Sequence, residues 1–485
     1  GGYRNTDSSF NNLSSNGYFW SSSQSSSTNA WKRKLNSGNT TVNRNNNNKA
    51  YGFSVRCLKD WLLPQGLNFF LGLSPFFLSM DYFENQLLRD LFQAYFDARR
   101  NKRSTINALD FEINYEKKIF ELYKEIRDRK YEIGPSICFV VKEPTLREIF
   151  AADFRDRIVH HLLYNYINPI FERLFINDSY SCRKRKGTLY GIKRVDHFIR
   201  SCSKNYNQDC YILKLDIKSY FMSIDHLILF QKVKEALFRY KDTTIINFDL
   251  DFVLILLEKV IFNDPTKNCI IKGSKEDWKN LPKDKSLFFT DKNKGLPIGN
   301  LTSQLFGNVY LNDFDHFIKC KLKIKYYGRY VDDFVIVHPD KEYLKSIVPQ
   351  LREYLKSNLF LNLHPKKIYL QHYSKGVSFL GAIIKPYRIY IKNRTKGNFY
   401  RKTKLWNDFW QKQKGKKVKR EDFNKFISNI NSYLGLTRHY QTYKLRNKLI
   451  EKNISSLLKP YISVDDDFKK IIFKSKVKYR KYISL

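Results

Sequence analysis

Three aspartates stand where apolar, strand-like segments end, and they are the side chains of this sequence best suited to chemistry. Asp216 closes the segment YILKLDI, and the adjacent pair Asp332 and Asp333 divides RYVDDFVIVH into two strand-like halves. Adjacent carboxylates repel each other, and between apolar strands they are costly unless a cation neutralises them. With Asp216, the pair could hold two Mg²⁺ ions about 4 Å apart, as in-line nucleotidyl transfer requires. Taken alone, the pair could equally form a polar hairpin tip.

The pattern around these acids predicts strands that alternate with helices. Strand signals cluster over residues 211–217, 324–338 and 377–391. An Asp that ends one strand and an Asp pair at the bend of a hairpin can then meet on one edge of a sheet. Apolar residues at three- and four-residue spacing predict helices over roughly 225–240, 302–320 and 341–358, and in the earlier segments FENQLLRDLFQAYFDARRNK, YEKKIFELYKEIRDRKYEIG and ADFRDRIVHHLLYNYINPIFERLF.

The charge balance indicates a polyanionic partner. Lys and Arg number 87 against 47 Asp and Glu, so the 485 residues carry a formal net charge of +40. Such an excess destabilises a compact fold unless a polyanion neutralises it, and nucleic acid is the leading candidate. From residue 391 onward the pattern is helical, and 26 basic residues face 7 acidic ones, a net +19. Seven cysteines without a CxxC pair argue against a disulfide framework or a zinc ribbon and fit a reducing cytosol.

The N-terminal part differs in composition from the rest. The first 50 residues contain 12 Asn and 11 Ser with few aliphatics, which predicts a segment that cannot order itself alone. Residues 61–79 form an uncharged apolar spacer of about the length of a membrane span, but two Pro and two Gly interrupt it, and no membrane partner is expected. Met80 is a candidate natural start.

The acidic segments resemble motifs of reverse transcriptases. YVDD is similar to motif C of that family, LKLDIKSYF to motif A, and GLPIGNLTSQLFGNVY, between them, to motif B. The resemblance covers residues 82 to 450 approximately. It implies an α+β fold, the right-hand polymerase, with fingers over 80–204, a palm with a ferredoxin-like sheet and part of the fingers over 205–390, and a basic helical thumb over 391–485.

Motif B departs from the common pattern of the family. Most relatives have a glutamine, a glycine, three residues, a serine and a proline, whereas this chain has Ile298, Gly299, Ser303 and Gln304. The isoleucine and the glutamine at the two ends of this motif resemble the reverse transcriptases of diversity-generating retroelements. That resemblance implies error-prone cDNA synthesis at template adenines, followed by mutagenic retrohoming. Replacing an amide by Ile removes a possible hydrogen bond to nucleotide groups, so discrimination should depend more on shape, but the focus on adenine does not follow from this argument.

The resemblance also implies a role for each of several residues. The metal ligands would be Asp216, Asp332 and Asp333 with the backbone of Ile217, and Mn²⁺ could replace Mg²⁺. The nucleotide-binding residues would be Arg147, Arg183, Phe221, Ile298, Gly299, Gln304 and Lys366. The primer grip would be Phe379, Leu380 and Gly381.

Each role has a physical basis and an alternative. A planar guanidinium suits triphosphate oxygens, yet Arg147 could be a solvated loop charge, and Arg183 with Lys184, Arg185 and Lys186 could be surface charges rather than contacts to nucleotide or template. Phe221 would crowd a ribose 2′-hydroxyl or fill a core. Lys366 or Lys367 would protonate the departing pyrophosphate or flank a strand. His160 and His161, adjacent on a helix, are interpreted as packing residues. Four aromatic residues on the basic helices suit a thumb along a duplex, namely Trp406, Trp410, Tyr433 and Tyr440.

The predicted partners are template RNA, RNA–DNA duplex, deoxynucleotides and a small basic helical accessory variability protein, in the cytoplasm of a bacterium or from a phage. Residues 1–60 resemble a C-type-lectin-like variable region. Because Asn codons begin with two adenines, this segment is interpreted as a translated template repeat. Three alternatives remain: a group II intron maturase, a retron or defence polymerase, and a catalytically idle RNA-binding protein.

Overall fold

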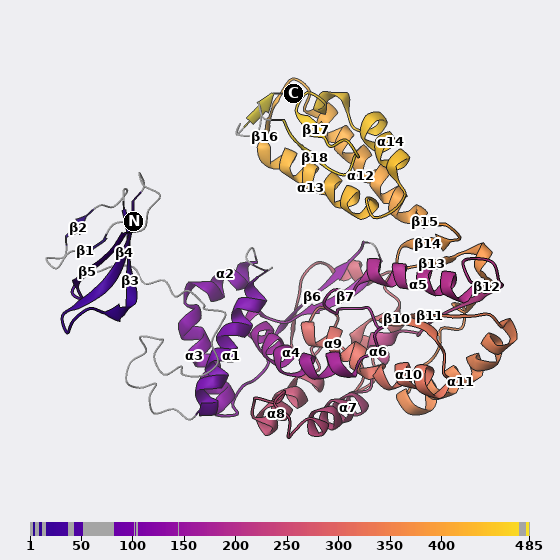
Figure 1. Cartoon of the computed structure of the whole chain (residues 1–485), viewed down its shortest axis with the longest axis horizontal. Coiled ribbons are helices and arrows are strands. Elements are labelled where there is room, and N and C mark those ends of the chain that lie inside the picture. The colour runs from indigo at the N-terminus through magenta and orange to yellow at the C-terminus, as the bar shows by residue number, and fades with distance from the viewer. Residues whose placement is uncertain are drawn as a thin grey trace. The chain divides into compact units, whose positions relative to one another are not determined.

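The computed structural model describes residues 3–4, 9–11, 16–36, 43–51, 82–100, 102, 105–143, 145–474 and 482–484. The chain forms two units, Gly1–Asp81 and Tyr82–Leu485, and each is described by itself (Figure 1). No helix within the described ranges is both long and apolar enough to cross a bilayer. The predicted spacer over residues 61–79 and the candidate start at Met80 lie outside the described residues.

The first unit contains an antiparallel sheet. Its strands, in sheet order, are β3 (Asn16–Gln24), β4 (Asn29–Asn36) and β5 (Asn43–Asn48), and the short strands β1 (Tyr3–Arg4) and β2 (Phe10–Asn11) pair with each other. Cations lie over aromatic rings across the strands, with Arg44 at 4.2 Å from the ring centroid of Trp31 and Lys32 at 4.9 Å from that of Tyr18. The prediction that this segment cannot order itself is therefore wrong for its described residues, because composition does not reveal such cross-strand pairs.

Helices open the second unit. They are α1 (Tyr82–Arg99), α2 (Ile106–Ile113), α3 (Tyr115–Arg127) and α4 (Phe154–Leu174), and α1 packs on both α3 and α4. The three long ones confirm the predicted helical segments. Their buried residues recur at helical spacing, as Leu88, Leu91 and Tyr95 do in α1. The carboxylate of Asp153 caps α4 by accepting a hydrogen bond from the N–H of Arg155 at 3.0 Å.

A small sheet combines two strands that lie between α3 and α4 in sequence with a third strand from residues 269–271. Its strands are β7 (Arg147–Ala151), β6 (Ser136–Val141) and β9 (Cys269–Ile271), in that order, with β9 parallel to β6. Buried Glu148 of β7 ties this sheet to the segment 275–289, because its carboxylate accepts hydrogen bonds from Trp278 Nε1 at 2.7 Å and from the backbone N–H of Leu287 at 2.7 Å.

The central sheet is antiparallel and has the order β10 (Tyr326–Tyr330), β11 (Asp333–His338), β8 (Tyr211–Asp216) and β12 (Tyr369–His372). The predicted strands at 211–217 and 324–338 are confirmed, the latter as a hairpin whose two-residue turn is Val331–Asp332. Helix α5 (Thr188–Cys202) packs on β10 and β11 (Figure 1). Residues of α5, β8 and β11 share one buried cluster.

Helices connect the strands of the central sheet. They are α6 (Tyr220–Ser223), α7 (His226–Arg239), α8 (Leu250–Ile261), α9 (Leu301–Tyr310), α10 (Asn312–His316) and α11 (Lys341–Leu359). The helix predicted over 302–320 is divided into α9, α10 and a π-helical turn over Phe317–Lys321. Helix α8 was not predicted, because the run VLILL is apolar without a helical period.

The predicted strand region 377–391 folds as three short strands, β13 (Val377–Phe379), β14 (Ala382–Lys385) and β15 (Arg388–Ile391). A helical module follows, with α12 (Asn393–Lys412), α13 (Arg420–Thr437) and α14 (Tyr443–Asn453), and with the strand pairs β16 (Lys417–Lys419) with β19 (Tyr482–Ser484) and β17 (Ile462–Val464) with β18 (Ile471–Phe473). This C-terminal module has its own core, in which Trp410 is fully buried and against which Trp406 and Tyr433 pack. Trp410 is therefore a core residue, whereas Trp406 and Tyr433 are partly buried, and contacts of these rings with a duplex stay a prediction.

Candidate active site

The register of the central sheet places Asp216 and Asp333 directly opposite each other on neighbouring strands. Asp332 lies in the adjoining turn, where its carbonyl accepts a hydrogen bond from the N–H of Ile217 at 3.3 Å. The carbonyl of Asp216 accepts one from the N–H of His364 at 2.8 Å. The structure thus brings the predicted acids together at one edge of the sheet, which we call the aspartate edge (Asp216, Asp332 and Asp333).

The aspartate edge carries negative charge that its surroundings do not fully compensate. Burial and then the charge of Asp216 raise the pKa of Asp332 to about 6. Burial also raises the pKa of Asp333 to about 6, against the charge of Lys214, whose Nζ lies 3.1 Å from Oδ2. The Oδ1 atom of Asp333 is buried and has no hydrogen-bond partner within the described part of the chain. A buried carboxylate oxygen without a donor is costly, so a cation is needed here.

Lys367 supplies part of this compensation, with its Nζ 2.9 and 3.0 Å from the two carboxylate oxygens of Asp216. In this arrangement no group of three or more His, Cys, Asp or Glu side chains among the described residues could hold a metal ion. The donor chemistry still fits a hard divalent cation, because two carboxyl groups have raised pKa values and one oxygen has no partner. Such a cation would compete with the Lys367 ammonium for Asp216.

A buried ion pair fastens the turn that carries Asp332. The guanidinium of Arg329 and the carboxylate of Asp315, both fully buried, are joined by bonds of 2.7 and 2.5 Å. Arg329 also donates to the carbonyl of Val331 at 2.9 Å. Val331 is β-branched and has a φ of +56°, a strained conformation that surrounding contacts must hold. Arg329 is therefore a positioning residue for the aspartate edge.

A cluster of apolar side chains lies beside the loop that follows Asp216. Phe221 and Ile298 pack against the buried residues Cys138, Phe150, Met222 and Leu287. Gly299 has a φ of +136°, and a Cβ there would lie 2.9 Å from the carbonyl oxygen of Phe150. The glycine thus lets the 298–299 loop approach the backbone of β7, where the N–H of Phe150 donates to the carbonyl of Ile298 at 2.9 Å. The structure thus places Phe221 and Ile298 against the same apolar cluster, whereas the sequence assigned their roles separately, from their positions in two motifs.

The other predicted residues of this region are distributed differently. Arg147 is exposed on β7, and its charge acts on Tyr330 of the YVDD turn. Gln304 is exposed on α9, whereas Ser303 is buried there. His160 is buried and bonded through Nδ1 to Thr302 at 2.8 Å, and burial lowers its pKa to about 3. The interpretation of His160 as a packing residue is confirmed, and the neighbouring His161 is half-buried.

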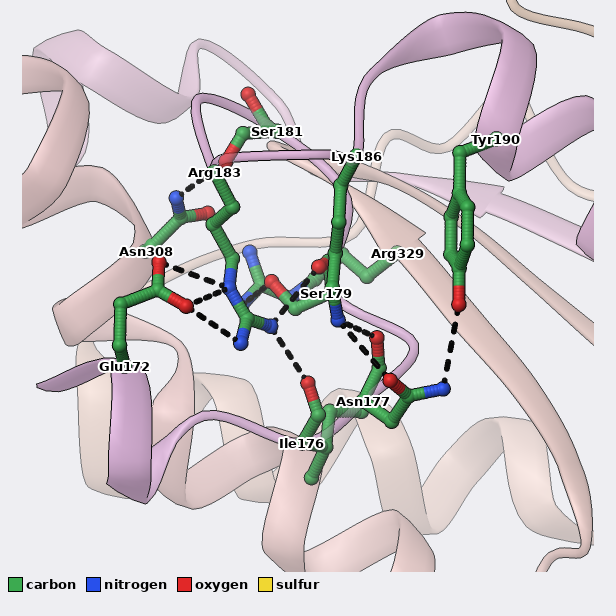
Figure 2. A network of polar contacts seen from close by, with 10 residues as sticks. All are labelled: Glu172, Ile176, Asn177, Ser179, Ser181, Arg183, Lys186, Tyr190, Asn308 and Arg329. Carbon is green, nitrogen blue, oxygen red and sulfur yellow. Dashed lines mark hydrogen bonds and ion pairs between the residues drawn. The ribbon is translucent and has the colours of Figure 1, made fainter.

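Arg183 is bound by acceptors of the protein itself, and its predicted role in nucleotide binding stays a prediction. Its guanidinium donates to both carboxylate oxygens of Glu172 at 2.9 to 3.1 Å, and to the carbonyls of Ile176 at 2.7 Å and Ser179 at 3.0 Å (Figure 2). Its side chain is only 6% exposed. The sequence could not show this, because the partners come from the end of α4 and the following loop.

The same network orders the basic loop around Arg183. Lys186 donates to the carbonyl of Asn177, and burial lowers the pKa of its ammonium to about 8 (Figure 2). Asn308 of α9 donates to the carbonyl of Ser181 at 2.8 Å, which ties the loop to motif B (Figure 2). Lys184 and Arg185 are exposed.

Two further predictions concern Lys366 and the primer grip. Lys366 is exposed, and Lys367 rather than Lys366 reaches the aspartate edge. Phe379 is buried at the end of β13, and Leu380 and Gly381 form the following turn with φ values of +47° and +86°. Leu380 packs against α5, where a Cβ on Gly191 would lie 3.0 Å from Leu380 Cδ1. The hairpin has the compact apolar geometry that was predicted, and its function remains a prediction.

Sequence reasoning missed four buried polar residues that fix these elements, namely Glu148, Asn300, Asp315 and Arg329, of which Arg329 and its partner Asp315 hold the turn of the aspartate edge. Buried Asn300 accepts a hydrogen bond from the N–H of Ala152 at 3.0 Å and so fixes motif B to β7. A signal was present for Arg329, because it is a charged residue within the apolar strand segment YYGRYVDDFVIV.

Comparison with known proteins adds independent findings. Residues 141–384 match the family described as Reverse transcriptase (RNA-dependent DNA polymerase), and residues 1–59 match the Fibrobacter succinogenes major domain. The protein YkfC of Escherichia coli K12 is 24% identical over 271 residues, which are 49% of this chain and 62% of YkfC. The putative COX1/OXI3 intron 2 protein of Saccharomyces cerevisiae is 24% identical over 315 residues, 56% of this chain and 35% of that protein. The chain thus spans less than two thirds of either relative.

Solved structures of telomerases share a weaker likeness. Telomerase from Candida albicans in complex with a TWJ fragment of telomeric RNA has 12% identity and a TM-score of 0.39, over 71% of this chain and 62% of that one. Truncated apo telomerase from Candida tropicalis has 14% identity and a TM-score of 0.38, over 54% and 55%. TM-scores of this size establish no common fold.

Proposed function

The chain belongs to the reverse transcriptase family, and from this premise we propose that it is an RNA-directed DNA polymerase whose catalytic centre is the aspartate edge. The observation that carries the proposal is the pairing of Asp216 with Asp333 beside Asp332, where one buried carboxylate oxygen has no partner within the described residues. Structural carboxylates are normally compensated, so uncompensated ones at a sheet edge favour cation-dependent chemistry.

Asp216, Asp332 and Asp333, with the backbone of Ile217, would hold two divalent cations, Mg²⁺ in the first instance and Mn²⁺ as a substitute. Bound there, the ions would lower the pKa of a primer 3′-hydroxyl and neutralise charge on a triphosphate. Lys214 and Lys367 partly neutralise the acids in this structure. If a cation displaced the Lys367 ammonium from Asp216, Lys367 would be free to donate a proton to the departing pyrophosphate. The motif resemblance assigned this role to Lys366 or Lys367.

The surrounding residues would bind and orient the substrates. Exposed Arg147 would contact the triphosphate of a deoxynucleotide, and the ring of Phe221 would crowd a ribose 2′-hydroxyl. The turn at Phe379, Leu380 and Gly381 would hold the primer end. In these terms residues 80–204 would be the fingers, 205–390 the palm with part of the fingers, and 391–485 the basic thumb. The thumb would follow the backbone of template RNA and of RNA–DNA duplex through its Lys and Arg residues.

The more specific proposal is that the enzyme belongs to a diversity-generating retroelement and copies a template-repeat RNA with errors at adenine. Its support is Ile298, which contributes an apolar surface beside Phe221 where most relatives have a glutamine amide. An apolar surface discriminates by shape and loses the selectivity of a buried hydrogen-bonding group. A small basic helical accessory protein is the proposed protein partner.

We further propose that residues 1–60 are the template repeat read in frame, with 61–79 as spacer and Met80 as the working start. The support is the match of residues 1–59 to a family other than the polymerase, together with the Asn-rich strand β5. The intact mass of the native protein tests this directly, because a mass that includes residues before Met80 would contradict it.

The polymerase proposal is tested by extending a DNA primer on an RNA template with Mg²⁺, with the accessory protein supplied, and by sequencing the products. We expect extension, with errors concentrated opposite adenine. Extension that is faithful at adenine would contradict the retroelement assignment and leave the polymerase standing. A protein that binds duplex but extends no primer would instead be an idle RNA-binding relative, in which the Lys367–Asp216 pair is permanent.

A further inference from the structure

A cavity of about 460 Å³ lies at the junction of α5, β15 and the loop between α13 and α14. It shares no lining residue with the aspartate edge. Three tyrosines line it, Tyr206, Tyr387 and Tyr440, together with Arg200, Arg388 and His439. We call it the tyrosine pocket. Its volume lies in the range of small-molecule sites, about 300–1,000 Å³, and is sufficient for one nucleotide.

The backbone that forms the tyrosine pocket is strained. Lys204, Asn205 and Tyr206 are three consecutive residues in the left-handed region, with φ values of +46°, +57° and +71°, and Tyr387 has a φ of +61°. Each such residue costs on the order of 1 kcal/mol, and consecutive ones are rare outside glycine. Three of these four residues, Asn205, Tyr206 and Tyr387, line the pocket.

Specific hydrogen bonds hold this strained segment in place. The N–H of Tyr206 donates to Ser203 Oγ at 2.9 Å, and the hydroxyl of Tyr373 donates to the carbonyl of Tyr206 at 2.9 Å. The rings of Tyr206 and Tyr387 approach to 4.6 Å between centroids at an angle of 59°. Backbone strain that several contacts maintain is typical of ligand sites, because these contacts fix the side chains before the ligand binds.

The chemistry of the lining suits a base and a phosphate. The ring of Tyr387 is mostly exposed, since the residue is 78% accessible, and so offers a face for stacking. The guanidinium of Arg200 makes no hydrogen bond or ion pair within the described residues, and its charge acts on Asp196 and Tyr206, which also line the pocket. Arg388 is different, because it donates to the carbonyl of Gln441 at 3.1 Å and so ties β15 to the thumb loop. Arg200 is thus the cation available for a phosphate.

The position of the pocket relates it to the predicted primer grip. Strand β14 carries the Leu380–Gly381 turn at one end and the Tyr387 turn at the other. Four residues of strand span about 13 Å. A strand held at the grip and running toward the basic C-terminal module would therefore pass the tyrosine pocket.

We propose that the tyrosine pocket binds one unpaired nucleotide of a nucleic-acid strand, with its base stacked on the exposed face of Tyr387, beside Tyr206, and its phosphate on Arg200. This inference rests on the proposed function only in that the strand would be RNA template. A free nucleotide has the same chemistry, so the test must separate the two sources.

The test measures the affinity of the full chain for a short, unstructured, fluorescent single-stranded RNA at fixed salt. Tyr387→Ala and Arg200→Ala are each expected to weaken binding about 10-fold, since stacking of one base is worth about 1–3 kcal/mol and 1.4 kcal/mol is tenfold. Arg200→Ala should also reduce the salt dependence by about one phosphate contact, whereas Tyr387→Ala should not. Matched controls are Phe238→Ala, which removes an exposed ring on α7, and Arg352→Ala, which removes an exposed charge on α11. Both should bind like the unchanged chain.

A second variant keeps the test independent of folding. Tyr387→Gly removes the ring and relieves the positive φ, so it should be at least as stable as the unchanged chain and still bind RNA about 10-fold more weakly. Wild-type affinity in Tyr387→Gly and Arg200→Ala would overturn the proposal. Competition by adenosine monophosphate as strong as by the RNA strand would overturn the assignment to a strand in favour of a free nucleotide.

Failure of this inference can be told apart from failure of the polymerase proposal. If primer extension is seen and the pocket variants bind RNA normally, the pocket assignment is wrong and the polymerase stands. If the unchanged chain extends no primer but its RNA binding depends on Tyr387 and Arg200, the pocket assignment stands and the polymerase proposal fails.

Discussion

Two groups of buried charge meet at the β10–β11 hairpin, one of them completed by Asp315 of α10, and they differ in how completely they are compensated. Asp315 and Arg329 are fully buried and pair with each other, and the hydroxyl of Tyr327 adds a bond of 2.5 Å to Asp315. A few residues along the chain, Asp332 and Asp333 have pKa values raised to about 6, with burial as the largest cause. Asp315 has Arg329 as its counter-ion, and this pair supports the turn. Asp332 and Asp333 are only partly neutralised by the protein and would need a bound cation for full neutralisation. This contrast separates structural charge from functional charge.

The largest effect should come from breaking the compensated pair. Arg329→Met leaves Asp315 buried without its partner, and loss of one member of a buried pair costs about 3–5 kcal/mol. We expect a fall of that size in the free energy of unfolding by urea. The double variant Arg329→Met with Asp315→Leu should recover much of the loss. A loss below about 1 kcal/mol for the single variant would show that the pair is not a structural one.

The uncompensated pair should behave in the opposite way. Its folded pKa of about 6 lies above the ordinary value of 3.8, so the folded protein holds more protons between these pH values, and stability falls as pH rises through this window. Asp332→Asn should therefore stabilise the metal-free protein at neutral pH by about 2 kcal/mol and weaken its pH dependence between pH 4 and 6, part of which stays because the pKa of Asp333 is also raised to about 6. The same variant should lose the stabilisation that Mg²⁺ gives the unchanged chain. Equal Mg²⁺ effects on thermal unfolding in both proteins would contradict this prediction.

Two arginines extend the comparison to cations. Arg183 is fully paired, so Arg183→Ala should lower the free energy of unfolding by about 2 kcal/mol, because the carboxylate of Glu172 and two backbone carbonyls lose their hydrogen-bond donor. Exposed Arg147 has no such partners among the described residues, so Arg147→Ala should leave stability within about 0.5 kcal/mol. Steady-state extension should then show a raised KM for deoxynucleotides only in Arg147→Ala. A raised KM for deoxynucleotides in a stable Arg183→Ala variant would instead support the predicted role of Arg183 in nucleotide binding.

The smallest difference within a pair of variants concerns two glycines in the left-handed region. In Gly299→Ala the new Cβ would meet the carbonyl oxygen of Phe150 at 2.9 Å, so both strain and a backbone clash oppose it, and we expect a loss of about 2 kcal/mol. Gly381→Ala has a φ of +86° but nothing within 4 Å of its Cβ, so only the backbone term of about 1 kcal/mol applies. Equal losses in urea unfolding would mean that the contact with β7 is not tight.

The sequence predicted the secondary structure around the acids because that signal is local. Strands at 211–217 and 324–338 follow from apolar runs, and the meeting of Asp216 with Asp333 follows from a hairpin next to a strand end. The partners of Arg183 and Arg329 could not be predicted in the same way, because they come from other elements and depend on packing. The Asn-rich strand β5 escaped prediction because its stability arises from cross-strand contacts of low-propensity residues.

One measurement tests the central claim, that the uncompensated carboxylates are a metal-dependent polymerase site. Extension of a DNA primer on RNA is compared between the unchanged chain and Asp332→Asn in Mg²⁺, with binding of the RNA–DNA duplex measured on the same samples. We expect extension to be lost in Asp332→Asn while duplex affinity stays within about 2-fold, because phosphate contacts of the basic module dominate binding. Extension retained by Asp332→Asn would contradict the claim.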